Sequence, residues 1–256
     1  MSKKPVDENK DLAVKEEAGA LTAIDFEEDA GAGFEDAGRE AYAIPFLRIL
    51  QSNSPQCKKL DPRYIQGAEE GDLINTVTEK IYKEGVLFVP CYYRQAFNLW
   101  APNRGGFRGS LTPMEYADTP THQKEIRGDD GKPKRVEVTD DGLVVDDTRE
   151  HYGIVVDRDA IIPVLICMNS SQIKKSKKWM TLMDGIRLPS HKPAPMFSQI
   201  YKISTVGESN DQGSWAGFKV EHYRPVQNKA IYDAAKTFRE MIRSGSAKPQ
   251  DIDDNF

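Results

Sequence analysis

Residues 151–168, with the sequence HYGIVVDRDAIIPVLICM, decide the fold class of this chain. Two apolar runs, 151–157 and 160–168, flank the pair Arg158-Asp159, which is typical of a tight turn between antiparallel strands. Both runs are rich in valine and isoleucine, and both are apolar on the two faces that a strand presents. The sequence therefore predicts a β-hairpin in the centre of a sheet.

Strands are also predicted upstream of this hairpin. AIPFLRIL at 43–50 is a short β-like run, and we expect the ordered part of the chain to begin there. GDLINTVTEKIY at 71–82 and GVLFVPCYYRQAFNLW at 85–100 are separated by the turn sequence Lys83-Glu84-Gly85. This pattern predicts a second hairpin, in which Pro90 indicates a bulge or an edge position.

A helix is predicted directly after the central hairpin, over residues 170–186, with Gly185 near its end. Asn169, followed three residues later by Gln172, is typical of a capping pair at a helix N-terminus. Trp179 begins an apolar set at helical spacing, so we expect its ring to anchor the helix in the core.

The last elements are a third hairpin and a closing helix. PMFSQIYKISTV at 195–206 and WAGFKVEHY at 215–223 are predicted strands, joined by the loop sequence GESNDQGS. Apolar residues then recur at helical spacing from about 228 to 243. The chain is thus predicted to be mostly β with a few helices, as an OB-like antiparallel barrel with an inserted loop and a C-terminal helix. Other α+β sandwiches fit the same order of elements.

Composition divides the chain into three parts. Residues 1–40 are rich in Glu, Asp, Ala and Gly and are expected to be a disordered acidic arm. Residues 41–243 form the predicted β-rich body, with an insertion at 111–150 that is either a loop or a small flap. Residues 244–256 are expected to be a flexible acidic tail.

The net charge of −5 conceals a basic body. Residues 1–40 carry a net charge of −7, residues 115–150 carry −5 and the last six residues carry −3, which leaves +10 for the remainder. Two interpretations remain open. A basic body attracts a polyanion by its local potential, or the charges segregate only because flexible segments are usually acidic.

The motifs of common enzyme classes are missing. The sequence contains no GxxxxGK[ST], GxGxxG, GxSxG or HExxH motif, and its four histidines have no ligand spacing. We therefore expect a protein that is not an enzyme and has no cofactor and no metal. The pairs Asp140-Asp141 and Asp146-Asp147, with Glu150, leave magnesium binding open as an alternative to solvated surface carboxylates.

Targeting signals are also missing. No apolar run approaches the roughly 18 residues that span a bilayer, and the N-terminus lacks the apolar core of a signal peptide. The three cysteines, Cys57, Cys91 and Cys167, have no CxxC spacing and are expected to be small hydrophobic residues in a reducing compartment. These observations predict a soluble, cytoplasmic protein with no membrane partner.

Basic and aromatic residues alternate in YYRQAFNLWAPNRGGFRGS, residues 92–110. Proteins hold single-stranded nucleic acid with cations along the phosphates and flat rings against the bases. The candidate contacts in this stretch are Tyr92, Arg94, Trp100, Arg104, Phe107 and Arg108. The alternative is that these residues form an ordinary solvent face, because a core face made by Tyr93, Phe97 and Leu99 produces the same alternation.

Two further basic groups follow the same logic. In the third hairpin, Trp215, Lys219 and Tyr223 are predicted to lie opposite an apolar face, with Lys202 as a neighbour. In the predicted helix, four lysines lie within five residues and can project together, either as a solvated face or as phosphate contacts. They are Lys174, Lys175, Lys177 and Lys178.

The C-terminal sequence is a short acidic ligand that ends in an aromatic residue. It consists of Asp251, Ile252, Asp253, Asp254, Asn255 and Phe256, which provide a ring for a pocket and carboxylates for a basic rim. This sequence resembles the acidic, Phe-ending tails of bacterial and phage single-stranded DNA-binding proteins, which recruit replication and repair partners. Asn255 stands where the bacterial tails commonly have proline, as in the phage form.

Three further blocks, at 43–56, 195–206 and 208–219, resemble a tailed-phage protein family for which DNA binding has been suggested. The second resemblance implies a phage origin. With the basic and aromatic surface and the tail, it leads us to expect a non-catalytic, non-sequence-specific single-stranded DNA-binding protein of phage DNA replication or recombination, in the cytoplasm of the bacterial host. The tail would bind replication or recombination proteins, and a homo-oligomer is left open. The alternatives are a virion or assembly protein and a host-directed effector, each of which would bind a protein partner.

Overall fold

The computed structural model describes residues 32–35, 42–102, 105–127, 133–158, 160–211, 213–247 and 249. The chain divides into two compact units, Met1–Gly38 and Arg39–Phe256. In the first unit the four described residues are exposed and include a turn. The rest of the predicted acidic arm lies outside the described residues, and the structure below is that of the second unit.

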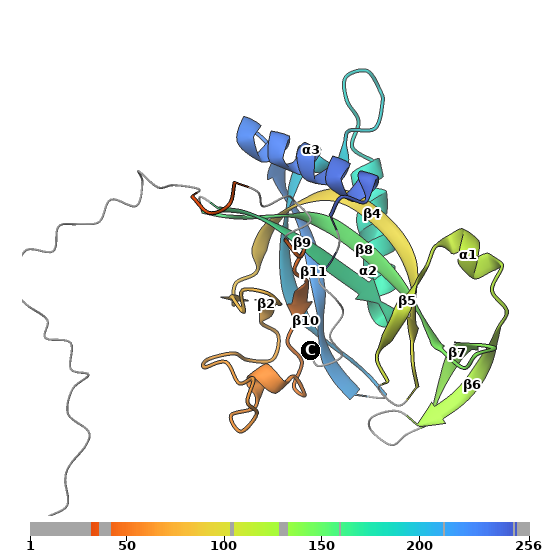
Figure 1. Cartoon of the computed structure of the whole chain (residues 1–256). Coiled ribbons are helices and arrows are strands. Elements are labelled where there is room, and N and C mark those ends of the chain that lie inside the picture. The colour runs from red at the N-terminus through yellow and green to blue at the C-terminus, as the bar shows by residue number, and fades with distance from the viewer. Residues whose placement is uncertain are drawn as a thin grey trace, which may run out of the picture. The chain divides into compact units, whose positions relative to one another are not determined.

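An antiparallel sheet of long strands dominates this unit, which confirms the prediction of a mostly β protein (Figure 1). The predicted hairpin of 151–168 is formed by β8 and β9, with Val155 opposite Ile162. The strand β8 lies inside the sheet as predicted, whereas β9 is not central, because among the described strands it pairs with β8 alone. The strand β4 pairs with β8 on its other side, and β5 and β10 both pair with β4. The bounds are β4 Val86–Trp100, β5 Phe107–Leu111, β6 Thr121–Arg127, β7 Pro133–Thr139, β8 Val144–Asp157, β9 Ala160–Asn169, β10 Gln199–Asn210 and β11 Gly213–Pro225.

Helices and a small second sheet cover the two faces of this large sheet. On one face α3 packs through Ala235 and Phe238 onto Val89 and Ile154 (Figure 1). On the other face Trp179 of α2 enters a core with Phe88. The bounds of these elements are α2 Ile173–Asp184, α3 Lys229–Ser244, β1 Leu47–Ile49, β2 Leu73–Asn75 and β3 Ile81–Tyr82, and the short 3-10 helices are Pro55–Cys57, Ser170–Gln172 and Met196–Ser198.

A closed OB-like barrel is not confirmed. Within the described part of the chain, the strand order of the large sheet runs from β11 to β6, and these two outer strands do not pair. The chain just before β1 approaches β9 through a single parallel bridge between Phe46 and Leu165. Side chains of α2 and of the segment after β1 occupy the outer edge of β11, so no strand completes the ring there.

The predicted hairpin of 71–82 with 85–100 is wrong. Residues 71–82 instead fold back on themselves, because Asn75 Oδ1 accepts hydrogen bonds from the amides of Val77 and Thr78 and closes a turn. The resulting strands β2 and β3 pair with each other, and β2 also pairs with β1. The strand β4 pairs instead with β5, β8 and β10 of the large sheet.

The predicted insertion at 111–150 contains regular structure. The helix α1, Pro113–Ala117, begins with a capping box between Thr112 and Glu115. The strands β6 and β7 form a hairpin that joins the large sheet through two residue pairs between β7 and β8. Residues 144–150 belong to β8, because they pair with residues 94–100 of β4.

The predicted capping pair at the start of α2 is also wrong. Neither Asn169 nor Gln172 makes a side-chain cap, because both side chains have partners in other elements. Asn169 Nδ2 donates to Asp146, and Gln172 bonds to the amide of Phe218. The closing helix is confirmed as α3, which Asn228 caps by accepting a hydrogen bond from the amide of Ala230.

None of the helices in the described part of the chain combines the length and the apolar character that are needed to cross a bilayer.

Candidate nucleic-acid interface

The β10–β11 hairpin extends beyond the strand that carries it. Its two strands pair from Gln199 opposite Pro225 to Asn210 opposite Gly213, so the pairing continues past the predicted strand ends at 206 and 215. Only residues 201–203 of β10 pair with β4. The distal half of the hairpin is therefore held by side chains from other parts of the fold rather than by a strand.

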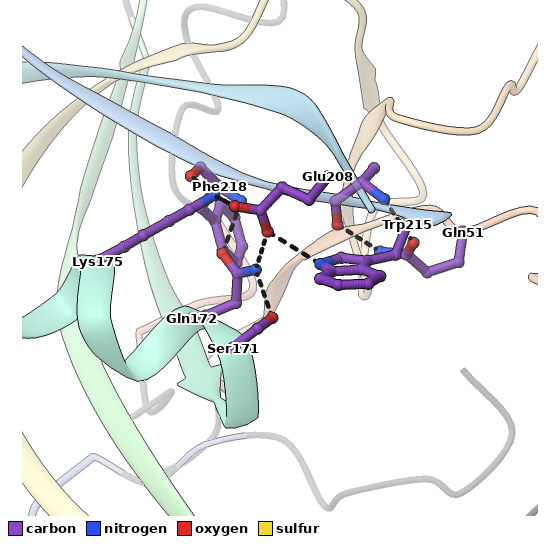
Figure 2. Close-up of polar contacts among 8 residues, drawn as sticks. Gln51, Ser171, Gln172, Lys175, Glu208, Trp215 and Phe218 are labelled. Carbon is purple, nitrogen blue, oxygen red and sulfur yellow. Dashed lines mark hydrogen bonds and ion pairs between the residues drawn. The ribbon is translucent and has the colours of Figure 1, made fainter. Parts of the chain in front are cut away.

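Three nitrogen donors surround the Glu208 carboxylate in this distal half (Figure 2). Lys175 Nζ lies 2.7 Å from Oε1, and Gln172 Nε2 and Trp215 Nε1 each lie 2.9 Å from Oε2. Gly217 faces the same cluster, and a Cβ at that position would overlap Glu208 and its partners. The missing side chain at Gly217 therefore makes the room in which the carboxylate and its donors meet.

The cluster holds Glu208 in its charged form. Partial burial acts to raise the pKa of Glu208, but the hydrogen bonds from Lys175, Gln172 and Trp215 outweigh it and hold the pKa below its usual value. The side chains of Lys175 and Glu208 are 25% and 26% exposed, so water reaches the edge of the pair. The site is a half-open arrangement of one cation and two neutral N–H groups around an anion.

Side chains also pair with the outer edge of β11. Gln51 Nε2 donates to the carbonyl oxygen of Ala216 at 2.9 Å, and Gln51 Oε1 accepts from the Ala216 amide at 3.0 Å. Gln172 Oε1 accepts from the Phe218 amide at 3.0 Å, and Lys175 Nζ donates to the Phe218 carbonyl at 2.6 Å. These bonds fix α2 and the segment after β1 against the hairpin, as Figure 2 shows.

Buried aromatic contacts fix α2 on the sheet. Trp179 is 1% exposed, which confirms the prediction that it belongs to the core, and its ring stacks on His151 of β8 with centroids 4.5 Å apart. Ser176 Oγ lies 2.8 Å from His151 Nε2. Burial lowers the pKa of His151 to about 3, so the imidazole is neutral at pH 7. The position of α2 is thus set from the centre of the sheet.

A cleft of about 190 Å³ lies between α2 and the hairpin. Its apolar wall includes Leu182 and Val206, whose side chains are 50% and 43% exposed. Lysines stand at its rim, so the cleft combines cations with accessible apolar surface. The lining residues are Lys175, Lys178, Trp179, Leu182, Val206, Phe218, Lys219 and Val220.

The α2 lysines differ in how they are used. Lys175 is committed to Glu208 and to the backbone of Phe218. Lys174, Lys177 and Lys178 are exposed, and none of them forms an ion pair with an acidic side chain in the described residues. Of the four lysines that the sequence singled out, these three present unpaired positive charge on α2, and Lys178 is the one of them that lines the cleft.

A family model described as Pam3 phage gp34-like protein matches residues 14–248. The chain belongs to this family. The matched range includes α2, the β10–β11 hairpin and Gln51, so the gp34-like part of the chain contains the whole arrangement described above. No curated protein and no solved structure matches the chain.

In this gp34-like chain, the candidates on β4 lie apart from the α2 lysines. Tyr93 lies beside His151 beneath α2, and neighbouring residues of a strand point to opposite faces, so Arg94 lies on the other face. Arg94 Nε donates to the buried carboxylate of Glu150 at 2.7 Å, and Arg94 Nη2 donates to Tyr152 at 3.0 Å. Its charge is therefore neutralised by a neighbour.

The other described candidates of this stretch also have partners within the chain. Tyr92 is partly buried beside Tyr152, with ring centroids 6.3 Å apart. The Trp100 and Phe107 rings pack edge to face at 5.5 Å, and Arg108 donates to the carbonyl of Gly105 at 2.9 Å. Arg104 lies outside the described residues.

Two of the four candidates in the hairpin lie at the Glu208 cluster or the cleft, and the other two lie near the end of the hairpin that pairs with β4. Trp215 and Lys219 lie at the Glu208 cluster and the cleft rim, although Lys219 is also 3.0 Å from Glu221. Lys202 is exposed and stands opposite Glu221 in the β10–β11 ladder. Tyr223 is exposed, and the guanidinium of Arg224 lies over its ring.

The second pair of acidic residues that left magnesium open, Asp146 and Asp147, has protein partners. Asp147 pairs with Arg149 at 2.7 Å, and Asp146 accepts from Asn169 at 2.7 Å. Burial raises the pKa of Asp146. In the part of the chain that the structure describes, no group of three or more His, Cys, Asp or Glu side chains is placed to hold a metal ion.

Sequence reasoning missed Gln51, Gln172 as a tie to the hairpin, and Glu208. An uncharged amide in a polar stretch carries no pattern that reveals its partner. Glu208 belongs to the sequence GESNDQGS, which predicts a loop. The candidates in the acidic tail lie outside the described residues, and they are Asp251, Ile252, Asp253, Asp254 and Phe256.

Proposed function

We propose that this phage protein binds single-stranded DNA, without sequence preference, along α2 and the distal half of the β10–β11 hairpin. The observation that carries the proposal is the set of three exposed α2 lysines, Lys174, Lys177 and Lys178, which have no ion-pair partner in the described residues. Lys178 lines an accessible apolar cleft between α2 and the hairpin.

The α2 lysines and the apolar cleft each match a chemical group of single-stranded DNA. Phosphates attract cations, and unpaired bases expose apolar faces that double-stranded DNA keeps stacked inside. The ammonium groups of α2 provide the first interaction, and Leu182 and Val206 provide apolar surface for the second. Duplex DNA would satisfy only the lysines, so the cleft favours the single strand.

In this proposal the protein acts by binding rather than by catalysis, in phage DNA replication or recombination within the bacterial host. Residues 251–256 recruit replication or recombination proteins, because three aspartates and a phenylalanine fit a basic pocket. A virion or assembly protein with an acidic protein partner is the competing function, and the same experiment separates the two.

The test is fluorescence anisotropy of the full chain with a dye-labelled oligo(dT) and with the matching duplex, at low and at high salt. The proposal requires tighter binding of the single strand and a steep loss of affinity with salt. Equal affinity for the single strand and the duplex would contradict the proposal, because it would show that the lysines attract any DNA by charge alone. No binding of either form would overturn the proposal and favour the protein partner.

A further inference from the structure

We propose that Lys175, Gln172 and Trp215 form a binding site for one phosphate group, and that Glu208 occupies this site until a phosphate of the bound strand displaces it. The inference rests on the proposed function, because the phosphate is taken to belong to single-stranded DNA. Glu208 is then an internal competitor that sets the affinity of the interface.

The donor set fits a phosphodiester. A carboxylate and a phosphodiester each carry one negative charge and present two acceptor oxygens to hydrogen-bond donors. Glu208 Oε1 receives the ammonium of Lys175 at 2.7 Å, and Oε2 receives the amide of Gln172 and the indole N–H of Trp215, both at 2.9 Å. A phosphodiester in the same place would use the same three donors.

The site is held in shape from outside the cluster. Lys175 also donates to the Phe218 carbonyl, and Gln172 accepts from the Phe218 amide, so both side chains stay beside β11 whether or not Glu208 is in place. Gly217 leaves the space in front of them free of a side chain. The donors are therefore preorganised, which lowers the cost of exchanging one anion for another.

Access and neighbouring charge favour the exchange. The Glu208 side chain is 26% exposed, so its carboxylate can rotate outward into water without unfolding the hairpin. The unpaired Lys178 lies at the rim of the adjoining cleft, on the path of a strand that follows α2. A phosphate that replaces Glu208 would thus continue the row of phosphate contacts made by α2.

The test compares three variants of the full chain in the oligo(dT) anisotropy assay. Glu208→Gln removes the competing charge but keeps the side-chain shape, and it is expected to raise the affinity about tenfold, the effect of one charge-assisted hydrogen bond. Glu208→Asp keeps the charge but retracts it from the donors, and a smaller gain is expected. Circular dichroism checks that each variant is folded.

Glu221→Gln is the matched control. Glu221 lies on β11, is 49% exposed and pairs with Lys219 at 3.0 Å, so its substitution changes the net charge by the same amount without touching the donors. A gain of at most about threefold is expected, as for a surface ion pair. Equal gains for Glu208→Gln and Glu221→Gln, or no gain for either Glu208 variant, would overturn the site and leave the proposed function standing.

A second measurement separates this inference from the proposed function. Inorganic phosphate is titrated into Glu208→Gln and into Glu208→Gln with Trp215→Phe, and tryptophan emission is followed. A saturable change that disappears when Trp215 is removed supports the anion site even if no oligonucleotide binds. Failure of both the oligonucleotide and the phosphate to bind to folded Glu208→Gln would reject the site together with the proposed function.

Discussion

The side-chain amide of Gln51 hydrogen-bonds both backbone groups of Ala216, at 2.9 Å and 3.0 Å, across 165 residues of sequence. An amide presents one donor and one acceptor side by side, as a neighbouring strand does. Gln51 therefore pairs with the edge of β11 at the point where a barrel would need another strand.

Gln51→Ala should destabilise the protein by about 1–3 kcal/mol, because the amide and carbonyl of the buried Ala216 would lose their partners. Urea unfolding followed by circular dichroism measures the loss. Gln66→Ala is the control, since Gln66 is exposed in the same connection between β1 and β2 and should cost little. Equal stability of the Gln51 and Gln66 variants would contradict this role of Gln51.

Replacing Lys174, Lys177 and Lys178 together by glutamine should weaken oligo(dT) binding. It should also lower the slope of log affinity against log salt by about 2, since each phosphate contact to a single strand contributes about 0.7. Lys175 is left in place because its ammonium group already pairs with Glu208 and donates to the carbonyl of Phe218 in the hairpin. The readout is anisotropy across a salt series.

The charge-matched control for that prediction is the replacement of Lys229, Lys236 and Arg243 by glutamine. These exposed residues lie on α3, which packs on the opposite face of the large sheet. The salt slope should be preserved in this control. An equal fall in slope for both triple variants would show that the total charge of the protein, rather than α2, controls binding.

Stability should decrease as the pH falls from about 6.5 toward 3 because of His151. Burial lowers the pKa of His151 from the ordinary value of 6.5 to about 3. Below pH 6.5 the unfolded chain binds a proton that the folded protein does not, so protonation favours unfolding. The loss reaches at most about 1.4 kcal/mol per pH unit from this residue and ends below the folded pKa.

Urea unfolding between pH 4 and pH 7 measures this dependence. His151→Gln should lower the stability at pH 7 but flatten its slope against pH, because the variant has no imidazole to protonate. His122→Gln, which removes an exposed imidazole, is the matched control variant. A wild-type slope in the His151 variant would assign the acid sensitivity to other groups.

Arg94→Met should destabilise the fold by about 2–4 kcal/mol, because it leaves the buried Glu150 carboxylate without its cation. Adding Glu150→Gln should recover part of the loss, which a double-mutant cycle from urea unfolding measures. Oligonucleotide affinity should stay unchanged wherever the variant is folded. A loss of affinity without a loss of stability would restore Arg94 as a DNA contact.

The sequence by itself determined the elements whose stability depends on local patterns. The hairpin of β8 and β9 and the helix α3 were predicted because continuous apolar runs and helical spacing recur within a few residues. The burial of Trp179 followed from the same helical spacing. The mostly β class was predictable for this reason, since it is the sum of such local patterns.

The strand pairing required the tertiary structure. Residues 71–82 and β4 are adjacent and both strand-like, which is why they suggested a hairpin. Asn75 closes a turn within the first segment, and β4 finds its partners in β8 and β10, far along the chain. Apolar periodicity indicates which residues are buried but does not indicate which strand they pair with.

The candidate interface was only half determined by the sequence. The lysine cluster was visible because charges near one another on a helix stay near one another in any fold. Only the tertiary structure decided that Lys175 faces the hairpin and forms an ion pair with Glu208, which lies 33 positions away in the sequence. The partner of a polar side chain depends on which elements lie side by side, and long-range packing sets that arrangement.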